Sequence, residues 1–413
     1  MIARLNTLML ARSGVHGSTV LLLSQMINRD ICPCIYDHGS VGASGDLVQL
    51  AHLALSMIGE GRVFHRGVIK PTSKAFEEEG LQPIAMYLRE GLALINGTSA
   101  MTGIGVLNVL YARRLLEWSI LASSVINEIV EAYDDHFSAS LNAAKLHEGQ
   151  RLVAARMRAL LHDSKLIRSR TEHLYQRNAE AGQAEDKIQE YYSIRCIPQV
   201  LGPVADTLKF SEKTVFDELN SANDNPLVFE EEQHVHHGGN FHGDYIALEM
   251  DKLKIAVTKL SMLCERQLNY LLNNKLNNKL PPFVNLGQIG FNFGMQGAQF
   301  TATSTVAENQ TLSYPMYVHS IPNNNDNQDI VSMGTNAALL TKKVIDNAFE
   351  VLAIEWLAIL QSVDYLQISD RLSSASRAAY FELRAIVPIF EQDFPLSDSL
   401  QQLRDFLKNE ERE

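Results

Sequence analysis

The chain has 413 residues, of which 46% are hydrophobic and 20% are charged, a composition typical of a globular protein with a large core. Its formal net charge of -12 argues against nucleic acid or an anionic membrane surface as a partner. Four cysteines form no Cys-x-x-Cys pair, which disfavours a zinc ribbon or a disulfide scaffold. Because no signal peptide or transmembrane run stands out, the sequence predicts a cytoplasmic protein.

The first predicted elements are two helices with a glycine-rich loop before the second. Leu5, Leu8 and Met9 keep helical spacing, but no capping residue precedes them, so the chain is expected to begin inside a helix. Apolar residues three and four positions apart predict a second helix over 47–58. The loop before it, 39–46, reads GSVGASGD. Such a loop is often only a turn, but backbone N–H groups at a helix start can also stabilise negative charge.

Three long helices are expected further along the chain, over 102–133, 246–276 and 335–366. Each carries a wide apolar stripe and cannot stand alone, so the helices should pack as a bundle. No Pro/Ser-rich linker separates them. The sequence therefore predicts an all-α, mainly helical fold in a single long-helix domain.

Polar loops rich in Asn, Gln and Gly flank these helices. They are INGTSAMTG at 95–103, SANDNPLVF at 221–229, HHGGNFHG at 236–243, FNFGMQG at 291–297 and IPNNNDNQD at 321–329. A single asparagine cluster usually makes a turn, so each loop alone is ambiguous. Several such loops at the ends of bundle helices indicate a polar site on a rigid scaffold.

The histidines His234, His236, His237 and His242 lie close together and superficially resemble a metal cluster. No carboxylate or thiolate at a familiar ligand spacing accompanies them. No metal is therefore expected at this loop.

Six motifs follow one another along the chain: GSVGASGDL at 39–47, NGT at 96–98, YYSIRCIPQ at 191–199, SANDNP at 221–226, GGNFHG at 238–243 and NNNDNQDIVSMG at 323–334. In this order they resemble the aromatic amino acid ammonia-lyases, which include the histidine, phenylalanine and tyrosine enzymes, and above all their bacterial tyrosine branch. The resemblance covers essentially the whole chain. It implies a long-helix bundle of the ammonia-lyase/fumarase–aspartase type over residues 1–413, and a homotetramer whose active sites are shared between subunits.

The resemblance also implies that Ala43-Ser44-Gly45 cyclises on itself to a 4-methylidene-imidazol-5-one group, with no external cofactor. The amide nitrogen of Gly45 would attack the carbonyl carbon of Ala43, and a residue without Cβ permits that approach. Ser44 would then lose its hydroxyl, which leaves an electrophilic methylene. The small Ala43 leaves room for the ring.

In the mechanism implied by the resemblance, the substrate amine adds to the methylene and a base removes a β-proton. Ammonia is then eliminated, and the product is a trans-cinnamate-type acid. Asn96 and Tyr192 match residues that hydrogen-bond around the electrophile. Arg195 matches the carboxylate-binding arginine, although a structural arginine is the alternative. The other matched pocket positions are Gln189, Asn225, Phe241, Asn324, Asn327 and Gln328. Phe241 taken alone would more often be a core residue.

Substrate choice is only partly predicted. Histidine-specific relatives place a glutamate where Gln328 stands, so histidine is disfavoured and tyrosine, then phenylalanine, is expected. An aminomutase is a related variant. Family members carry a lid tyrosine, the general base, upstream of the Ala-Ser-Gly loop. This chain is expected to lack that segment, which leaves a catalytically inactive remnant as the alternative.

Overall fold

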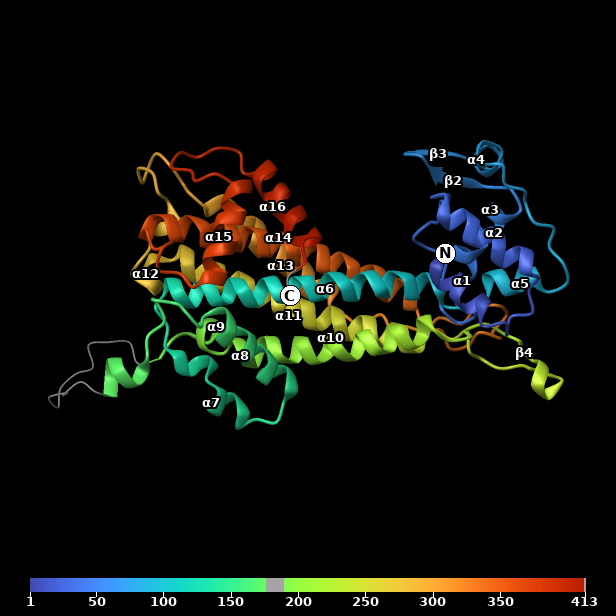
Figure 1. Cartoon of the computed structure of the whole chain (residues 1–413), viewed down its shortest axis with the longest axis horizontal. Coiled ribbons are helices and arrows are strands. Elements are labelled where there is room, and N and C mark those ends of the chain that lie inside the picture. Colours follow the sequence, from blue (N-terminus) through green and yellow to red (C-terminus); the bar gives the residue numbers. More distant parts are fainter. Residues whose placement is uncertain (176–188, 412–413) are drawn as a thin grey trace. The chain divides into compact units, whose positions relative to one another are not determined.

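The computed structural model describes residues 1–175 and 189–411, and most of these lie in helices (Figure 1). The predicted mainly helical fold is confirmed. Contacts divide the chain into two compact units, each built from three segments. Unit 1 comprises Met1–Val109, Phe210–Lys252 and Tyr314–Lys342, and unit 2 comprises Leu110–Lys209, Leu253–Ser313 and Lys343–Glu413. The expectation that residues 1–413 form a single domain is not tested by this division and stays a prediction.

Four long helices contribute residues to both units: α6 (Ser99–Ile129), α10 (Ile197–Leu219), α11 (Asp244–Leu272) and α14 (Gly334–Leu366). The three long helices expected from apolar spacing are confirmed as α6, α11 and α14, with shifts of a few residues at their ends. The expected helix over 246–276 divides near its end because the side chain of Asn273 accepts a hydrogen bond from the backbone N–H of Lys275 and so starts a new short helix, α12 (Asn274–Asn277). Among the described residues, no helix is both long and apolar enough to cross a membrane.

Unit 1 gathers short helices and strands around one apolar core. Its remaining elements are α1 (Ile2–Met9), α2 (Gly17–Asn28), β1 (Cys32–Pro33), α3 (Leu47–Met57), β2 (Arg62–His65), β3 (Val68–Pro71), α4 (Thr72–Glu79), α5 (Glu90–Ile95), β4 (Leu227–Phe229), a 3-10 turn (Glu230–Glu232) and β5 (His234–His236). The helix expected over 47–58 is confirmed as α3, which packs against α2 and α5. Leu23, Met26, Leu53 and Met57 lie in the shared core and are fully or almost fully buried.

The strands of unit 1 form two small antiparallel sheets. In the first, β2 lies between β1 and β3, and Val63 pairs with Lys70 across the β2–β3 hairpin. The second contains only β4 and β5. Helix α4 contacts both β2 and β3 of the first sheet and lies beside them (Figure 1). Neither sheet holds any of the predicted site residues.

Unit 2 is a helix bundle. Besides its parts of the long helices it contains a 3-10 turn (Asp134–Phe137), α7 (Ala139–Ala143), α8 (Glu148–Leu160), a π-helical turn (Thr171–Tyr175), α9 (Tyr192–Arg195), α12, a second 3-10 turn (Pro282–Val284), α13 (Gln296–Leu312), α15 (Ser374–Ile386) and α16 (Ser397–Asn409). Trp118 of α6 and Trp356 of α14 pack edge to face in its core, with ring centroids 5.7 Å apart. Ser123 of α6 and Gln267 of α11 are joined by a buried hydrogen bond of 3.0 Å.

Candidate functional site

The Ala-Ser-Gly sequence lies in the loop that leads into α3 of unit 1. Ala43 is buried and packs against Val331 and Met333 of the loop before α14. Ser44 remains partly exposed, whereas Gly45 is buried and pairs with Gly97 in an isolated parallel bridge. Ser44 is therefore accessible at the surface of the loop, whereas the residues before and after it, Ala43 and Gly45, are fixed by contacts inside the protein.

Glycine is required at both positions of that bridge. Gly45 has a φ of +75°, and a Cβ there would lie 2.0 Å from the carbonyl oxygen of Gly97. Gly97 has a φ of +144°, and a Cβ there would lie 2.3 Å from Nη1 of Arg4. Side chains rarely adopt such backbone angles, and these have no space either. The two backbones are therefore in closer contact than any other residue type would allow.

Two predicted site residues hydrogen-bond directly to Ser44. Asn96, the buried residue that ends α5, donates from Nδ2 to the carbonyl oxygen of Ser44 at 2.9 Å. Gln328 donates from Nε2 to the hydroxyl oxygen of the same serine at 2.7 Å. The loop that carries Gln328 is closed by backbone bonds with Asn323 of 3.0 and 3.2 Å. The structure thus brings residues 96 and 328, far apart in the sequence, onto one serine.

Asp46 is a further residue of this site, and sequence reasoning assigned it no role. One carboxylate oxygen accepts hydrogen bonds from the hydroxyls of Ser40, at 2.8 Å, and Thr335. The other accepts the backbone N–H groups of Ala100 and Met101, each at 2.8 Å, in the first turn of α6. Burial raises the pKa of Asp46 above its ordinary value, although the four hydrogen bonds oppose that rise. An acid just before a helix ordinarily caps that helix, but Asp46, which precedes α3, accepts the N–H groups of the first turn of α6 instead.

Four other predicted residues also belong to unit 1. Asn225 accepts a hydrogen bond from the backbone N–H of Gly238 at 2.6 Å. Phe241 is half-buried just before α11. Asn324 and Asn327 are exposed, and the backbone N–H of Asn327 donates to the carbonyl of Asn324 at 3.2 Å. These contacts hold the loops in shape and do not by themselves assign the side chains a role.

The loop that carries Phe241 is tied to the Ala-Ser-Gly loop through backbone groups. Gly243 donates its N–H to the carbonyl oxygen of Gly42 at 3.0 Å. The hydroxyl of Ser332 donates to the same carbonyl at 3.0 Å. The loops before α3, α11 and α14 therefore meet at Gly42, one residue before Ala43.

The remaining predicted residues, Gln189, Tyr192 and Arg195, lie in unit 2. Tyr192 is 72% exposed, and the guanidinium of Arg195 lies over its ring, 5.0 Å from the centroid. Gln189 and Arg195 both line a cavity of about 400 Å³ that also includes His136. Burial lowers the pKa of His136, so its ring is neutral at physiological pH. The predicted site residues thus form two groups, one in each unit.

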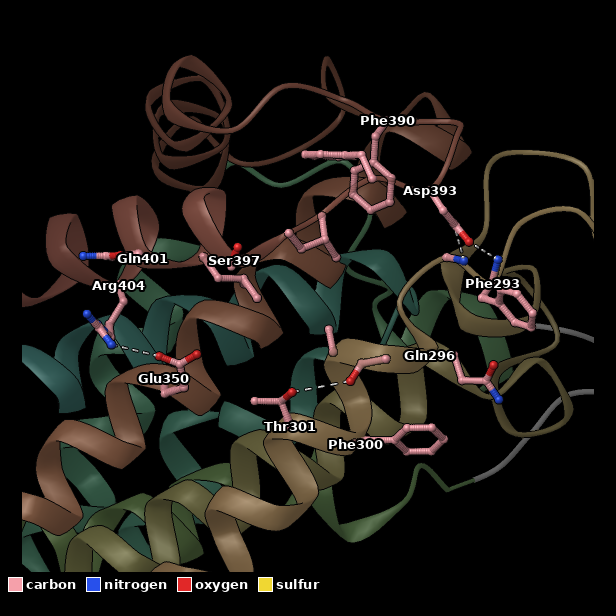
Figure 2. A pocket seen from close by; sticks show the side chains of 16 residues that line it. Phe293, Gln296, Phe300, Thr301, Glu350, Phe390, Asp393, Ser397, Gln401 and Arg404 are labelled. Carbon is pink, nitrogen blue, oxygen red and sulfur yellow. Dashed lines mark hydrogen bonds and ion pairs between the residues drawn. The ribbon is translucent and has the colours of Figure 1, made fainter.

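A larger cavity of about 760 Å³ in unit 2 contains none of the predicted site residues (Figure 2). Phe293, Phe300 and Phe390 form its apolar wall. Its charged groups have partners: Arg404 pairs with Glu350 at 3.2 Å, and a carboxylate nearby, Asp393, accepts the backbone N–H of Phe293 at 2.6 Å. The charged side chains of this cavity are therefore already engaged within the protein.

The histidines of the histidine-rich loop contact one another and a nearby glutamate. His234 and His236 lie on β5 with their rings 4.5 Å apart, and Nε2 of His236 contacts Glu232 at 2.8 Å. Over residues 1–175 and 189–411, no group of three His, Cys, Asp or Glu side chains could hold a metal ion.

The close contact between Gly45 and Gly97 predicts that Gly45→Ala lowers the free energy of unfolding by about 3 kcal/mol, because strain at positive φ adds to a collision with backbone. The matched control is Gly67→Ala, at a φ of +79° with nothing within 4 Å, which should cost only about 1 kcal/mol. Urea unfolding of the two variants checks this. Equal losses would contradict the contact.

The chain is similar in sequence and in structure to known enzymes. The family model described as aromatic amino acid lyase matches residues 1–385. The chain is 41% identical to the tyrosine ammonia-lyase of Cupriavidus metallidurans (99% of this chain, 78% of the relative) and 40% identical to the histidine ammonia-lyase of Shouchella clausii (99% and 79%). It is 42% identical to the MIO-dependent tyrosine 2,3-aminomutase of Streptomyces globisporus (99% and 77%). A crystal structure of the tyrosine aminomutase from that organism superposes with a TM-score of 0.94 at 40% identity, covering 98% of this chain and 78% of the other.

Proposed function

Because the chain belongs to the aromatic amino acid lyase family, we propose that it removes ammonia non-oxidatively from an aromatic L-amino acid, tyrosine before phenylalanine, and releases a trans-cinnamate-type acid. The observation that carries the proposal is the Ala43-Ser44-Gly45 loop with the side-chain amide of Asn96 on the carbonyl oxygen of Ser44. That oxygen would become the ring oxygen of a 4-methylidene-imidazol-5-one. A donor at this position stabilises negative charge on it.

The loop residues fit the formation of this group. The nitrogen of Gly45 would bond to the carbonyl carbon of Ala43, whose oxygen leaves as one water. The hydroxyl of Ser44 leaves with the α-proton as a second water. Asn96 stabilises negative charge on the Ser44 carbonyl oxygen as the α-proton departs. Gln328 donates a hydrogen bond to the hydroxyl oxygen of Ser44 and assists the departure of that hydroxyl. Once formed, the group supplies an electrophilic methylene that takes up the substrate amine, a reactivity that ordinary side chains do not have.

The residues of unit 2 supply substrate contacts in this proposal. Arg195 binds the substrate carboxylate through its planar guanidinium, and Tyr192, stacked under that guanidinium, hydrogen-bonds near the reacting centre. Gln189 of unit 2, and separately Asn225, Phe241, Asn324 and Asn327 of unit 1, are further substrate-binding residues in this proposal. The neutral amide of Gln328 favours a tyrosine or phenylalanine ring over imidazole, since it offers no carboxylate to imidazole N–H groups. A cytoplasmic homotetramer with shared active sites is part of the same proposal.

A second candidate is a 2,3-aminomutase that moves the amine to the β-carbon instead of releasing it. The observation that favours it is the relative named tyrosine 2,3-aminomutase, which is as similar to this chain as the tyrosine ammonia-lyase is. Incubation with L-tyrosine and chromatography of the products distinguish coumarate and ammonia from β-tyrosine. The same incubation with L-histidine tests the histidine alternative.

The electrophile is tested without any activity assay. The intact mass of the purified protein should be lower than the sequence mass by two water molecules, because ring closure and dehydration each release one. Ser44→Ala should not show the loss of two waters, because its side chain has no hydroxyl to eliminate and ring closure alone would release only one. A wild-type protein that is folded, as judged by circular dichroism, yet keeps the full mass would refute the proposed chemistry and favour a catalytically inactive chain.

A further inference from the structure

Arg4 of α1 is a completely buried arginine in unit 1. It donates from Nη2 to the carbonyl oxygen of Ala93 at 2.6 Å and from Nη1 to Oδ1 of Asn223 at 3.4 Å. Its counter-charge is Asp224, with an N–O distance of 3.6 Å and an equally buried side chain. Burial lowers the pKa of Arg4 to about 10, so the side chain remains cationic at neutral pH. Burying such a charge is costly, which calls for a specific role in the fold or the site.

The guanidinium lies directly behind the turn that holds the Ala-Ser-Gly loop. A Cβ at Gly97 would lie 2.3 Å from Nη1 of Arg4 and 2.7 Å from the backbone oxygen of Asn223. The carbonyl oxygen of Gly97, in turn, accepts the N–H of Asp46 at 2.7 Å and lies 2.0 Å from where a Cβ of Gly45 would be. Arg4, Gly97 and Gly45 are thus stacked in van der Waals contact.

The residues held by Arg4 adjoin the Asn96–Gly97 turn, whose Asn96 amide contacts Ser44. Ala93, whose carbonyl accepts from Arg4, belongs to α5, and Asn96 is the residue that ends this helix. Asn223 is fixed a second time, because the hydroxyl of Thr7 donates to its Oδ1 at 3.3 Å. The guanidinium therefore joins α1, the end of α5 and the loop after α10 at one point behind residues 96 and 97.

We propose that Arg4 is a positioning residue for ring closure: by holding Ala93 and Asn223, it presses the Asn96–Gly97 turn against the Ala-Ser-Gly loop. It touches none of the reacting atoms. It acts through Gly97, which limits where Gly45 can lie, and through Asn96, which binds the serine carbonyl. This inference rests on the proposed cyclisation, so its test includes a measurement that does not depend on ring formation.

The first experiment follows ring closure by intact mass at successive times after a short induction of expression. Arg4→Met should slow the loss of two waters by at least about tenfold, because a displacement of about 1 Å costs an intramolecular reaction on the order of 100-fold. Arg4→Lys keeps a cation but not the planar fork, and should be intermediate. The control is Arg12→Met. Arg12 belongs to the same unit and pairs with Glu231, so ring closure in this variant should proceed at the wild-type rate.

The second experiment is done in Ser44→Ala protein, which cannot form the methylidene group, and in preparations whose intact mass equals the sequence mass, so that the ring is absent. Peptide-resolved hydrogen exchange compares this protein with and without Arg4→Met. If Arg4 positions the turn, peptides covering 40–50 and 93–101 should exchange at least about tenfold faster, because the bond from Asp46 N–H to Gly97 loosens. Peptides from unit 2 should be unchanged.

The outcomes separate the two ideas. Wild-type protein that never loses two waters refutes the cyclisation, while the exchange experiment still decides whether Arg4 positions the turn. Arg4→Met and Arg4→Lys proteins that are folded, close at the wild-type rate and leave exchange at 40–50 and 93–101 unchanged would overturn the proposal. If Arg4→Met does not fold, Arg4→Lys alone decides in both experiments. A uniform rise in exchange over all of unit 1, with unchanged closure, would show a merely structural role and likewise overturn it.

Discussion

Replacing Glu355 by glutamine is expected to make the protein more stable at alkaline pH and to remove the pH dependence of stability that this carboxyl contributes. Glu355 lies on α14 in the core of unit 2 with its side chain completely buried. Among the described residues, its carboxyl oxygens interact with the Cys264 thiol and with no nitrogen or oxygen donor. Burial raises the pKa of this carboxyl from 4.5 to about 8, and the neighbouring Cys264 thiol opposes the rise only in part.

The direction of the effect follows from proton binding in the two states. Between pH 4.5 and pH 8 the folded protein keeps a proton on Glu355 that the unfolded chain releases. Stability therefore falls as pH rises through this window, and the loss is complete above the folded pKa. A shift of this size corresponds to a loss on the order of 5 kcal/mol. Glutamine keeps the shape of the neutral acid and has no proton to lose.

Urea unfolding at a series of pH values between 4 and 9 measures this. The difference in free energy of unfolding between Glu355→Gln and wild type should grow in favour of the variant by several kcal/mol from pH 5 to pH 9. Glu350→Gln, on the same helix, is the control: that side chain forms a partly exposed ion pair with Arg404, so its loss should cost less than about 1 kcal/mol at every pH. A difference for Glu355→Gln that does not change with pH would show that this carboxyl is not buried as described.

The long helices could be predicted from the sequence because local spacing alone defines them. Apolar residues every three and four positions continue for about thirty residues in α6, α11 and α14, and no glycine or proline interrupts the middle of α11. Their ends were less predictable, since they depend on single side chains such as Asn273, which starts a new helix. The two units were not predicted at all, because each is assembled from three separated segments.

The site could be predicted only where a motif carried it. Asn96 and Gln328 were named from a resemblance, and the structure adds the contacts of both with Ser44. Arg4 was not found, because an arginine near the start of an amphipathic helix is ordinarily a surface residue. Its burial depends on Asn223 and Asp224, about 220 positions away, and no local pattern records such a contact. The residues of unit 2 remain predictions of the motif alone.

Asp46 shows most clearly how a long-range contact determines stability. Its carboxylate joins three parts of unit 1: the Ala-Ser-Gly loop through Ser40, the first turn of α6 through Ala100 and Met101, and the start of α14 through Thr335. All four donors are protein groups in a site closed to water around this side chain. Without the carboxylate, the Ser40 hydroxyl keeps the carbonyl oxygen of Gly45 at 3.3 Å as an acceptor, whereas the hydroxyl of Thr335 and the two backbone N–H groups lose theirs. Each buried donor left unpaired costs about 1–3 kcal/mol.

We therefore expect Asp46→Ala to lower the free energy of unfolding by about 4 kcal/mol, after allowing for the burial cost that disappears with the charge. Asp46→Asn keeps one acceptor oxygen and should lose about half as much. Asp163→Ala is the matched control, because Asp163 accepts the backbone N–H of Ser374 at the start of α15 at 3.0 Å but lies at the surface. Its loss should cost about 1 kcal/mol, as for an exposed helix cap. Urea unfolding of the three variants gives the comparison, and an Asp46→Ala loss no larger than that of Asp163→Ala would mean that Thr335, Ala100 and Met101 find other acceptors.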